Sequence, residues 1–150
     1  QKWAFCFQMT AYISRLEELK KALNCDYDFI FCERSIFTDK NIFAKLLYQD
    51  FKIEDIEYTV YKMWFDTFSK DFSEPFKIYI QTVPEVCYQR IVKRSRPGEQ
   101  NICQEYLTRC HEAHEEWMQN PELVLDGNVD NEEIDIYTMW LKKIDQCLHI

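Results

Sequence analysis

Three short apolar runs, separated by amphipathic stretches, constrain the fold of this 150-residue chain more than any other feature. They lie at 28–32 (DFIFC), 76–81 (FKIYIQ) and 123–125 (LVL). Runs of this length are typical of strands that are buried in a parallel sheet. Because amphipathic helices are predicted around and between the runs, the order of elements indicates an α/β fold.

The helices are predicted from apolar residues that recur at helical spacing. The longest spans 3–23, where Asn24 ends the periodic run. Pro84 suits the first turn of another helix, which runs to about Arg94. The remaining helices are expected at 41–49, 54–70, 104–119 and 131–148. The chain length favours a single domain over residues 1–150.

Composition excludes several classes of protein. A net charge of −8 argues against binding duplex DNA or an anionic membrane through bulk electrostatics. No apolar run approaches the roughly 20 residues of a membrane span. We therefore expect a soluble, intracellular protein with neither nucleic acid nor membrane as a partner. The seven cysteines form no C-x-x-C pair and are expected to be reduced.

Charged side chains follow the first two apolar runs. The first run is followed by Glu33, Arg34, Ser35 and Asp39, and the second by Arg90, Arg94 and Arg96. The carboxyl ends of parallel strands form the crevice in which such sheets hold ligands. An acid beside an always-charged guanidinium suits metal and phosphate chemistry. The pattern therefore predicts a site that handles nucleotides.

Two clusters have alternative explanations that the sequence leaves open. The basic residues near Arg94 could complement the dipole of their own helix and have no role in binding a ligand. A second cluster has a spacing that zinc could use, at His111, His114 and Glu115. A solvated helix face explains this cluster equally well, because neither an H-E-x-x-H order nor a clear third ligand accompanies it.

Four separated segments agree in order and spacing with one protein family. They are Phe7-Gln8, Glu33-Arg34-Ser35, the R-x-x-x-R-x-R segment from Arg90 to Arg96, and the stretch from IYIQTVPEVCYQRI to EYLTRCHEAHEEW. From Trp3 to about Asn128 the chain resembles the deoxynucleoside kinases, in the deoxycytidine and deoxyguanosine kinase branch. The resemblance implies a P-loop kinase-like parallel sheet flanked by helices. It also implies transfer of the ATP γ-phosphate to the 5′ hydroxyl of a deoxynucleoside, with Mg²⁺ as the metal.

The resemblance implies that the first helix and the segment after the first strand hold the acceptor. In the family, the glutamine of the Phe7-Gln8 element contacts the nucleobase, and Gln8 can present a donor and an acceptor together. Phe43 would stack on the same base. The small Ala11 leaves room beside them.

Arg15 lies seven residues beyond Gln8 on the same helix face and could pair with Asp39. This pair, together with the small alanine, resembles the combination found in the branch of the family that accepts deoxycytidine and purine deoxynucleosides. The alternative for Arg15 is an exposed pair with Glu18 at i, i+3.

The resemblance also implies which residues act on the phosphoryl group. Arg34 would hold the region of the 5′ hydroxyl, Glu33 would help to place Mg²⁺, and Glu99 would bond the 3′ hydroxyl of the sugar. A lid over about 90–101 would surround the transferred group with Arg90, Arg94 and Arg96. The segment that contacts the adenine of ATP is matched by Asp126 and Asn128.

The chain departs from the family in one respect. A kinase of this kind needs a G-x-x-x-x-G-K-[ST] loop whose amides hold the donor phosphates, yet the only glycines are Gly98 and Gly127. The family's catalytic glutamate and a sugar-contacting tyrosine would precede the residue that matches Gln1. We therefore expect an incomplete, amino-terminally truncated kinase domain that is inactive by itself. Its compartment is expected to be cytoplasmic or mitochondrial.

Two other functions remain open from the sequence. The missing loop favours a non-catalytic, kinase-like structural subunit, although the retained Glu33, Arg34 and lid arginines oppose it. A nucleoside monophosphate kinase such as thymidylate kinase has a similar topology, but the Phe7-Gln8 element and the E-R-S spacing favour a nucleoside acceptor. The partners expected are a deoxynucleoside and, through helix packing, a second copy of the chain.

Overall fold

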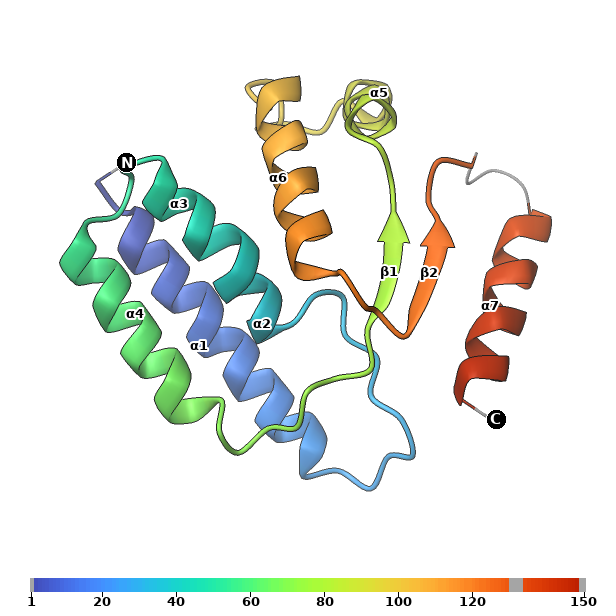
Figure 1. Cartoon of the computed structure of the whole chain (residues 1–150), viewed down its shortest axis with the longest axis horizontal. Helices are drawn as coiled ribbons and strands as arrows, with labels where there is room; N and C mark the ends of the chain where they lie inside the picture. The colour runs from blue at the N-terminus through green and yellow to red at the C-terminus, as the bar shows by residue number, and fades with distance from the viewer. Residues whose placement is uncertain (1, 130–133, 149–150) are drawn as a thin grey trace. The chain divides into compact units, whose positions relative to one another are not determined.

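The computed structural model describes residues 2–129 and 134–148. The chain divides into two compact units, Gln1–Ser73 and Glu74–Ile150. The first unit is helical, whereas the second combines helices with a parallel sheet (Figure 1). This combination confirms the α/β class. The single domain over 1–150 stays a prediction.

Unit 1 consists of helices that follow the predicted ones closely. The helix α1 (Ala4–Leu23) matches the run predicted at 3–23, and α4 (Asp55–Phe68) matches the one predicted at 54–70. Between them, the chain is helical without interruption through α2 (Ile36–Thr38), η1 (Asp39–Ala44) and α3 (Lys45–Gln49). The helix expected to begin at residue 41 thus begins at Ile36.

This earlier start has a local cause in the chain. The Ser35 hydroxyl accepts a hydrogen bond from the Thr38 amide at 3.3 Å, and the Ser35 amide donates to the Thr38 hydroxyl at 3.2 Å. This capping box satisfies amides that the first turn of a helix leaves unbonded. The following segment, η1, is a π-helix, a rare form that occurs mostly as short stretches within α-helices and frequently at functional sites.

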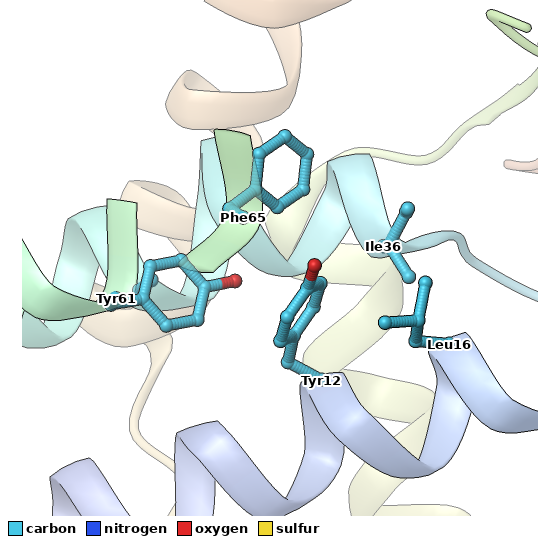
Figure 2. Close-up of a cluster of buried hydrophobic side chains, with 6 residues drawn as sticks. Tyr12, Leu16, Ile36, Tyr61 and Phe65 are labelled. Carbon is cyan, nitrogen blue, oxygen red and sulfur yellow. The ribbon is translucent and has the colours of Figure 1, made fainter. Parts of the chain in front are cut away.

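The core of unit 1 lies between α1, α2 and α4. Figure 2 shows Tyr12 and Leu16 on α1 facing Ile36, Tyr61 and Phe65. The Tyr12 ring centroid lies 5.7 Å from those of Tyr61 and Phe65, with the Tyr61 ring at an edge-on angle of 64°. Aromatic pairs in this arrangement add to the stabilisation that burial provides. The helices that carry Gln8 and Asp39 are thereby fixed to one another.

The prediction of a strand at 28–32 is wrong. The segment has no regular secondary structure, and its rings at Phe29 and Phe31 are 47% and 68% exposed. A parallel strand is stabilised by hydrogen bonds to a neighbouring strand. In the described part of unit 1 no strand is available to pair with it. An apolar run specifies side chains that can be buried, but it does not specify a neighbouring strand with which the segment can pair.

Unit 2 is a parallel strand pair with a helical crossover. The strands β1 (Ile78–Gln81) and β2 (Leu123–Asp126) pair in register over their whole length. The crossover consists of α5 (Pro84–Arg94) and α6 (Gln104–Trp117), which contact each other, and α7 (Ile134–Leu148) contacts β2. Both strands and all three helices were predicted. The expected start of the last helix at residue 131 lies outside the described residues.

The turn after β2 approaches β1 closely. The Gly127 amide donates to the Gln81 carbonyl at 2.7 Å, which extends the strand pairing by one bond. A Cβ atom at Gly127 would lie 2.1 Å from the Thr82 hydroxyl oxygen and 3.0 Å from the Gln81 carbonyl oxygen. Only glycine fits this position without displacing its neighbours.

We expect Gly127→Ala to destabilise unit 2 by about 1 to 3 kcal/mol, because overpacking forces either the backbone or Thr82 to move. Chemical denaturation of the two proteins measures the difference. Adding Thr82→Ala should recover part of the loss, since it removes the closest contact. Equal stability of Gly127→Ala and wild type would contradict the close packing of this turn.

Candidate functional site

The first part of the candidate site lies on one face of α1. Gln8, Ala11 and Arg15 are spaced to share this face, and the Gln8 side chain is 3% exposed. The neighbouring Phe7 is 71% exposed and faces away from the core. A buried amide on a helix otherwise packed through apolar side chains is unusual, because glutamine is mostly a surface residue.

The buried amide lies in the same unit as an ion pair of which only the carboxylate is buried. The Arg15 guanidinium bonds Oδ1 of Asp39, the first residue of η1. Asp39 is 2% exposed, whereas the Arg15 side chain is 33% exposed. The predicted Arg15–Asp39 pair is therefore confirmed. The alternative pair with Glu18 does not form, because the guanidinium lies against η1.

Burial dominates the ionisation of this carboxyl group. Loss of hydration raises the pKa of Asp39, and the bond to Arg15 offsets only part of that effect. Its second oxygen, Oδ2, has no hydrogen-bond partner among the described residues. A buried carboxylate oxygen without a donor is costly, and it can bind a donor on a ligand.

The E-R-S segment lies in the turn that leads into α2. Arg34 has a left-handed backbone conformation with φ of 66°, and its guanidinium carbon lies 4.9 Å from the centroid of the Phe43 ring. Residues other than glycine adopt this conformation at a cost, and it occurs disproportionately at functional sites. Glu33 is exposed beside it. The turn thus brings an acid, a cation and an aromatic ring into one small region of unit 1.

The arginines of the predicted lid have different environments in unit 2. Arg94 makes a bidentate ion pair with Glu99, with nitrogen–oxygen distances of 2.8 and 2.9 Å. Arg96 is 68% exposed and lies 3.9 Å from the same carboxylate. Ser95, between the two arginines, is left-handed with φ of 46° and ends α5. The loop therefore already has an internal charge pair that a phosphate group would have to compete with.

Arg90 and the turn after β2 form a separate network. The Arg90 guanidinium donates to the carbonyls of Gly127 at 2.7 Å and Val129 at 2.6 Å. The Asn128 side chain accepts a bond from the Val83 amide and donates to Asp126, at 2.8 Å in both cases. These bonds join α5 to the end of β2, so three of the predicted site residues have internal structural partners.

The histidine cluster on α6 has an explanation other than zinc. Tyr79 and Gln81, both on β1, donate to the Glu115 carboxylate at 2.7 and 2.8 Å, and these bonds lower the pKa of Glu115. The His114 ring stacks parallel to that of Tyr79. No group of three or more potential ligand side chains gathers at one point among residues 2–129 and 134–148. None of the helices there has the length and apolarity of a membrane span.

Comparison with known proteins identifies the family. Residues 1–147 match the family model for deoxynucleoside kinases, and the chain belongs to this family. Human deoxycytidine kinase is 32% identical over 99% of this chain and 65% of its own length. Deoxycytidine kinase 1 of Xenopus laevis is 34% identical, over 93% and 56% respectively. The mitochondrial deoxyguanosine kinase of Xenopus laevis is 29% identical over 79% of this chain and 48% of its own length.

These comparisons confirm the resemblance seen in the sequence motifs. The chain spans about half to two thirds of the length of these curated relatives. Sequence reasoning missed two further polar residues in the core of unit 1, Tyr12 on α1 and Tyr61 on α4, which are both 0% exposed. Tyr12 could have been found, because it lies between Gln8 and Arg15 at helical spacing. Tyr61 gave no such signal, since its helix is distant in the sequence.

The ionisation of Asp39 gives a test of this site. A carboxyl group whose pKa is raised by folding binds protons more tightly in the folded state than in the unfolded state. The free energy of unfolding therefore falls as pH rises from the unfolded pKa, near 3.9, through the folded pKa, and is constant above it. Asp39→Asn should remove this contribution.

Urea denaturation of wild type and Asp39→Asn between about pH 4 and 7 measures the effect. The stability of wild type minus that of the variant should decrease as pH rises and then level off. A difference that instead increases with pH would mean that Arg15, rather than burial, controls the carboxyl group.

Proposed function

We propose that this protein functions as a deoxynucleoside kinase that transfers the γ-phosphate of ATP to the 5′ hydroxyl of a deoxynucleoside. The observation that carries the proposal is the ion pair of Arg15 with the buried Asp39, in the same helical unit as the buried Gln8 amide and in a chain of this family. Such polar groups are expensive to bury and give little stability to a helical core. They are useful where a polar ligand must be recognised.

The acceptor base is proposed to bind beside α1 and η1. Gln8 supplies a donor and an acceptor to the base edge, and the Arg15–Asp39 pair supplies both charges. Ala11 leaves space, and Phe43 provides a ring on which a base can stack. We propose deoxycytidine or a purine deoxynucleoside as the substrate, consistent with the names of the relatives.

Glu33 and Arg34 are proposed to act at the reacting hydroxyl. Mg²⁺ commonly binds through one or two carboxylates together with substrate phosphates, so the exposed Glu33 suits a site that the donor nucleotide completes. Such an ion would supply positive charge to the phosphoryl oxygens. Arg34 would orient the 5′ hydroxyl region of the acceptor. Phe43 fixes its guanidinium through the cation–π contact.

The lid is proposed to contribute Arg94 and Arg96 to the transferred phosphoryl group. Glu99 now neutralises Arg94, and in the complex it would bond the sugar 3′ hydroxyl. The predicted adenine contacts at Asp126 and Asn128 fit less well, because both side chains already hold the turn after β2. We assign a structural role to these two residues and to Arg90.

Two further properties belong to the proposal. The compartment is cytoplasmic or mitochondrial, as one relative is named a mitochondrial enzyme. A second copy of the chain is proposed to associate through helices, since α4 exposes Ile56, Met63 and Trp64. Clustered apolar side chains on a helix surface are typical of protein contacts.

Acceptor choice tests the proposed base site. In the protein expressed from the complete coding sequence, Arg15→Met together with Asp39→Ala should reduce kcat/KM for deoxycytidine and purine deoxynucleosides and raise it for thymidine. The reason is that a polar recognition pair is replaced by space. Asp39→Ala alone should be worse, because it leaves Arg15 unpaired. Unaltered substrate ratios in the double variant would remove both residues from the site.

Turnover tests the proposed lid. Arg94→Ala or Arg96→Ala should lower kcat by about 100-fold or more with little change in deoxynucleoside affinity, because the charge that they neutralise is largest in the transition state. Arg94→Lys should recover activity only in part, since an ammonium lacks the planar fork. Lys93→Ala is the control and should have a far smaller effect. Normal turnover per folded molecule, with lost stability, would favour the helix-dipole explanation.

A further inference from the structure

A polar contact joins α6 to the first strand of unit 2. The Tyr79 hydroxyl and the Gln81 side-chain amide both donate to Oε1 of Glu115, at 2.7 and 2.8 Å. The His114 ring, next to Glu115 on α6, stacks parallel to the Tyr79 ring with an angle of 4° between the planes. The proposed function uses none of these residues. The two bonds to Glu115 form what is here named the Glu115 bridge.

The Glu115 bridge constrains geometry more than it adds stability. Glu115 is exposed, so water would solvate its carboxylate if the protein donors were absent. Bonds that replace bonds to water give only a small net free energy. Tyr79 and Gln81 lie two residues apart on one face of β1, and both donate to the same oxygen. Two donors fix the position of that oxygen along β1, which a single bond would leave variable.

Successive turns connect the charges of the predicted lid to α6. The loop 95–103 joins α5 to α6 and contains Arg96 and Glu99. The Ile102 amide donates to the Glu99 carbonyl at 3.0 Å, and the Glu99 amide donates to the Arg96 carbonyl at 3.2 Å. The Glu99 carboxylate in turn holds the Arg94 guanidinium through the bidentate ion pair. A continuous series of contacts therefore runs from the start of α6 to Arg94 and Arg96.

The helix α6 can transmit the position of Glu115 to this loop. Glu115 lies about 16 Å along the helix from Gln104, its first residue, at a rise of about 1.5 Å per residue. Gln104 donates to the carboxylate of Glu85 in the first turn of α5, at 3.1 Å. Polar contacts thus hold α6 to α5 at its start and to β1 near its end. Without the Glu115 bridge, α6 can slide and rotate against β1, and the loop attached to its start moves with it.

We propose that Glu115 is a positioning residue for phosphoryl transfer, which holds α6 against β1 so that the lid arginines lie at the transferred group. The inference rests on the proposed kinase function and extends it to a residue that acts through the lid. The charge on the phosphoryl oxygens must be stabilised in the transition state, so the placement of the arginines governs kcat. Misplacement of a reacting geometry by about 1 Å can lower a rate by about 100-fold.

Kinetics of the protein from the complete coding sequence test this role. Glu115→Ala should lower kcat by about tenfold or more, while the KM for deoxycytidine changes less than about twofold, because the proposed base site lies in unit 1. Glu115→Gln should recover most of the loss, since its Oε1 atom accepts the same two bonds. Tyr79→Phe keeps the stacked ring and removes one donor, so its kcat should lie between those of Glu115→Ala and wild type.

Glu112→Ala is the matched control. It removes an exposed carboxylate one turn earlier on the same helix, and kcat should stay as in wild type. A normal kcat in both Glu115→Ala and Tyr79→Phe would overturn the proposal. An equal loss in Glu112→Ala would also overturn it, because the effect would then belong to the charge of α6 rather than to its contact with β1.

A second comparison separates positioning from stability. If Glu115 acts through the lid charges, Glu115→Ala should lower kcat by a smaller factor in a protein that already carries Arg96→Ala, since one of the groups that it positions is gone. A general loss of folded protein would instead lower activity by the same factor in both backgrounds. Equal factors would therefore overturn the proposal.

Hydrogen exchange distinguishes failure of this inference from failure of the proposed function. The amides of the loop 95–103 should exchange faster in Glu115→Ala than in wild type and Glu112→Ala, while those of β2 stay unchanged. Unchanged exchange in the loop would overturn the inference by itself. Absence of nucleoside phosphorylation by wild type would instead reject the kinase proposal, and the exchange rates would still decide whether Glu115 holds the loop in place.

Discussion

The buried carboxylate of Asp39 is the constraint on which the helical unit depends. A carboxylate removed from water loses hydration that only close donors can replace, and Arg15 replaces it at one oxygen. This requirement fixes the distance between α1 and the start of η1. The aromatic contacts of Tyr12 hold α4 against the same helix. Apolar packing thus provides the stability of unit 1, while the ion pair determines which polar groups meet inside it.

In the second unit, close packing and hydrogen bonds join a short pair of strands to a helix. Gly127 lets the chain pass close to β1, and Arg90 and Asn128 bond the turn to α5. Polar residues here satisfy backbone groups at the carboxyl ends of parallel strands, the region where such sheets bind ligands. The exposed arginines lie at the end of α5 and in the loop after it, where Arg94 and Arg96 are both near Glu99. Structural and candidate catalytic arginines are therefore separated by only a few residues.

Most of the regular structure was predictable, and the errors have physical causes. Helical periodicity located α1, α4, α5 and α6 to within a few residues, because a helix forms its hydrogen bonds within its own segment. The strand predicted at 28–32 failed because a strand needs a partner, which no local pattern contains. The earlier start of the helix at Ile36 depends on the capping box of Ser35 and Thr38, two residues that apolar periodicity does not include.

The sequence by itself determined the family, through motifs whose order and spacing survive at about one third identity, and it predicted Gln8, Arg15 and Asp39 as a recognition group. Only the tertiary structure decided which charges are buried and which are exposed. In the fold, Asp39 is buried and Glu33 is exposed. Arg90 donates hydrogen bonds to backbone carbonyls, whereas Arg96 is exposed. Burial and hydrogen-bond partners depend on contacts between distant segments, and a local pattern of residue types cannot specify them.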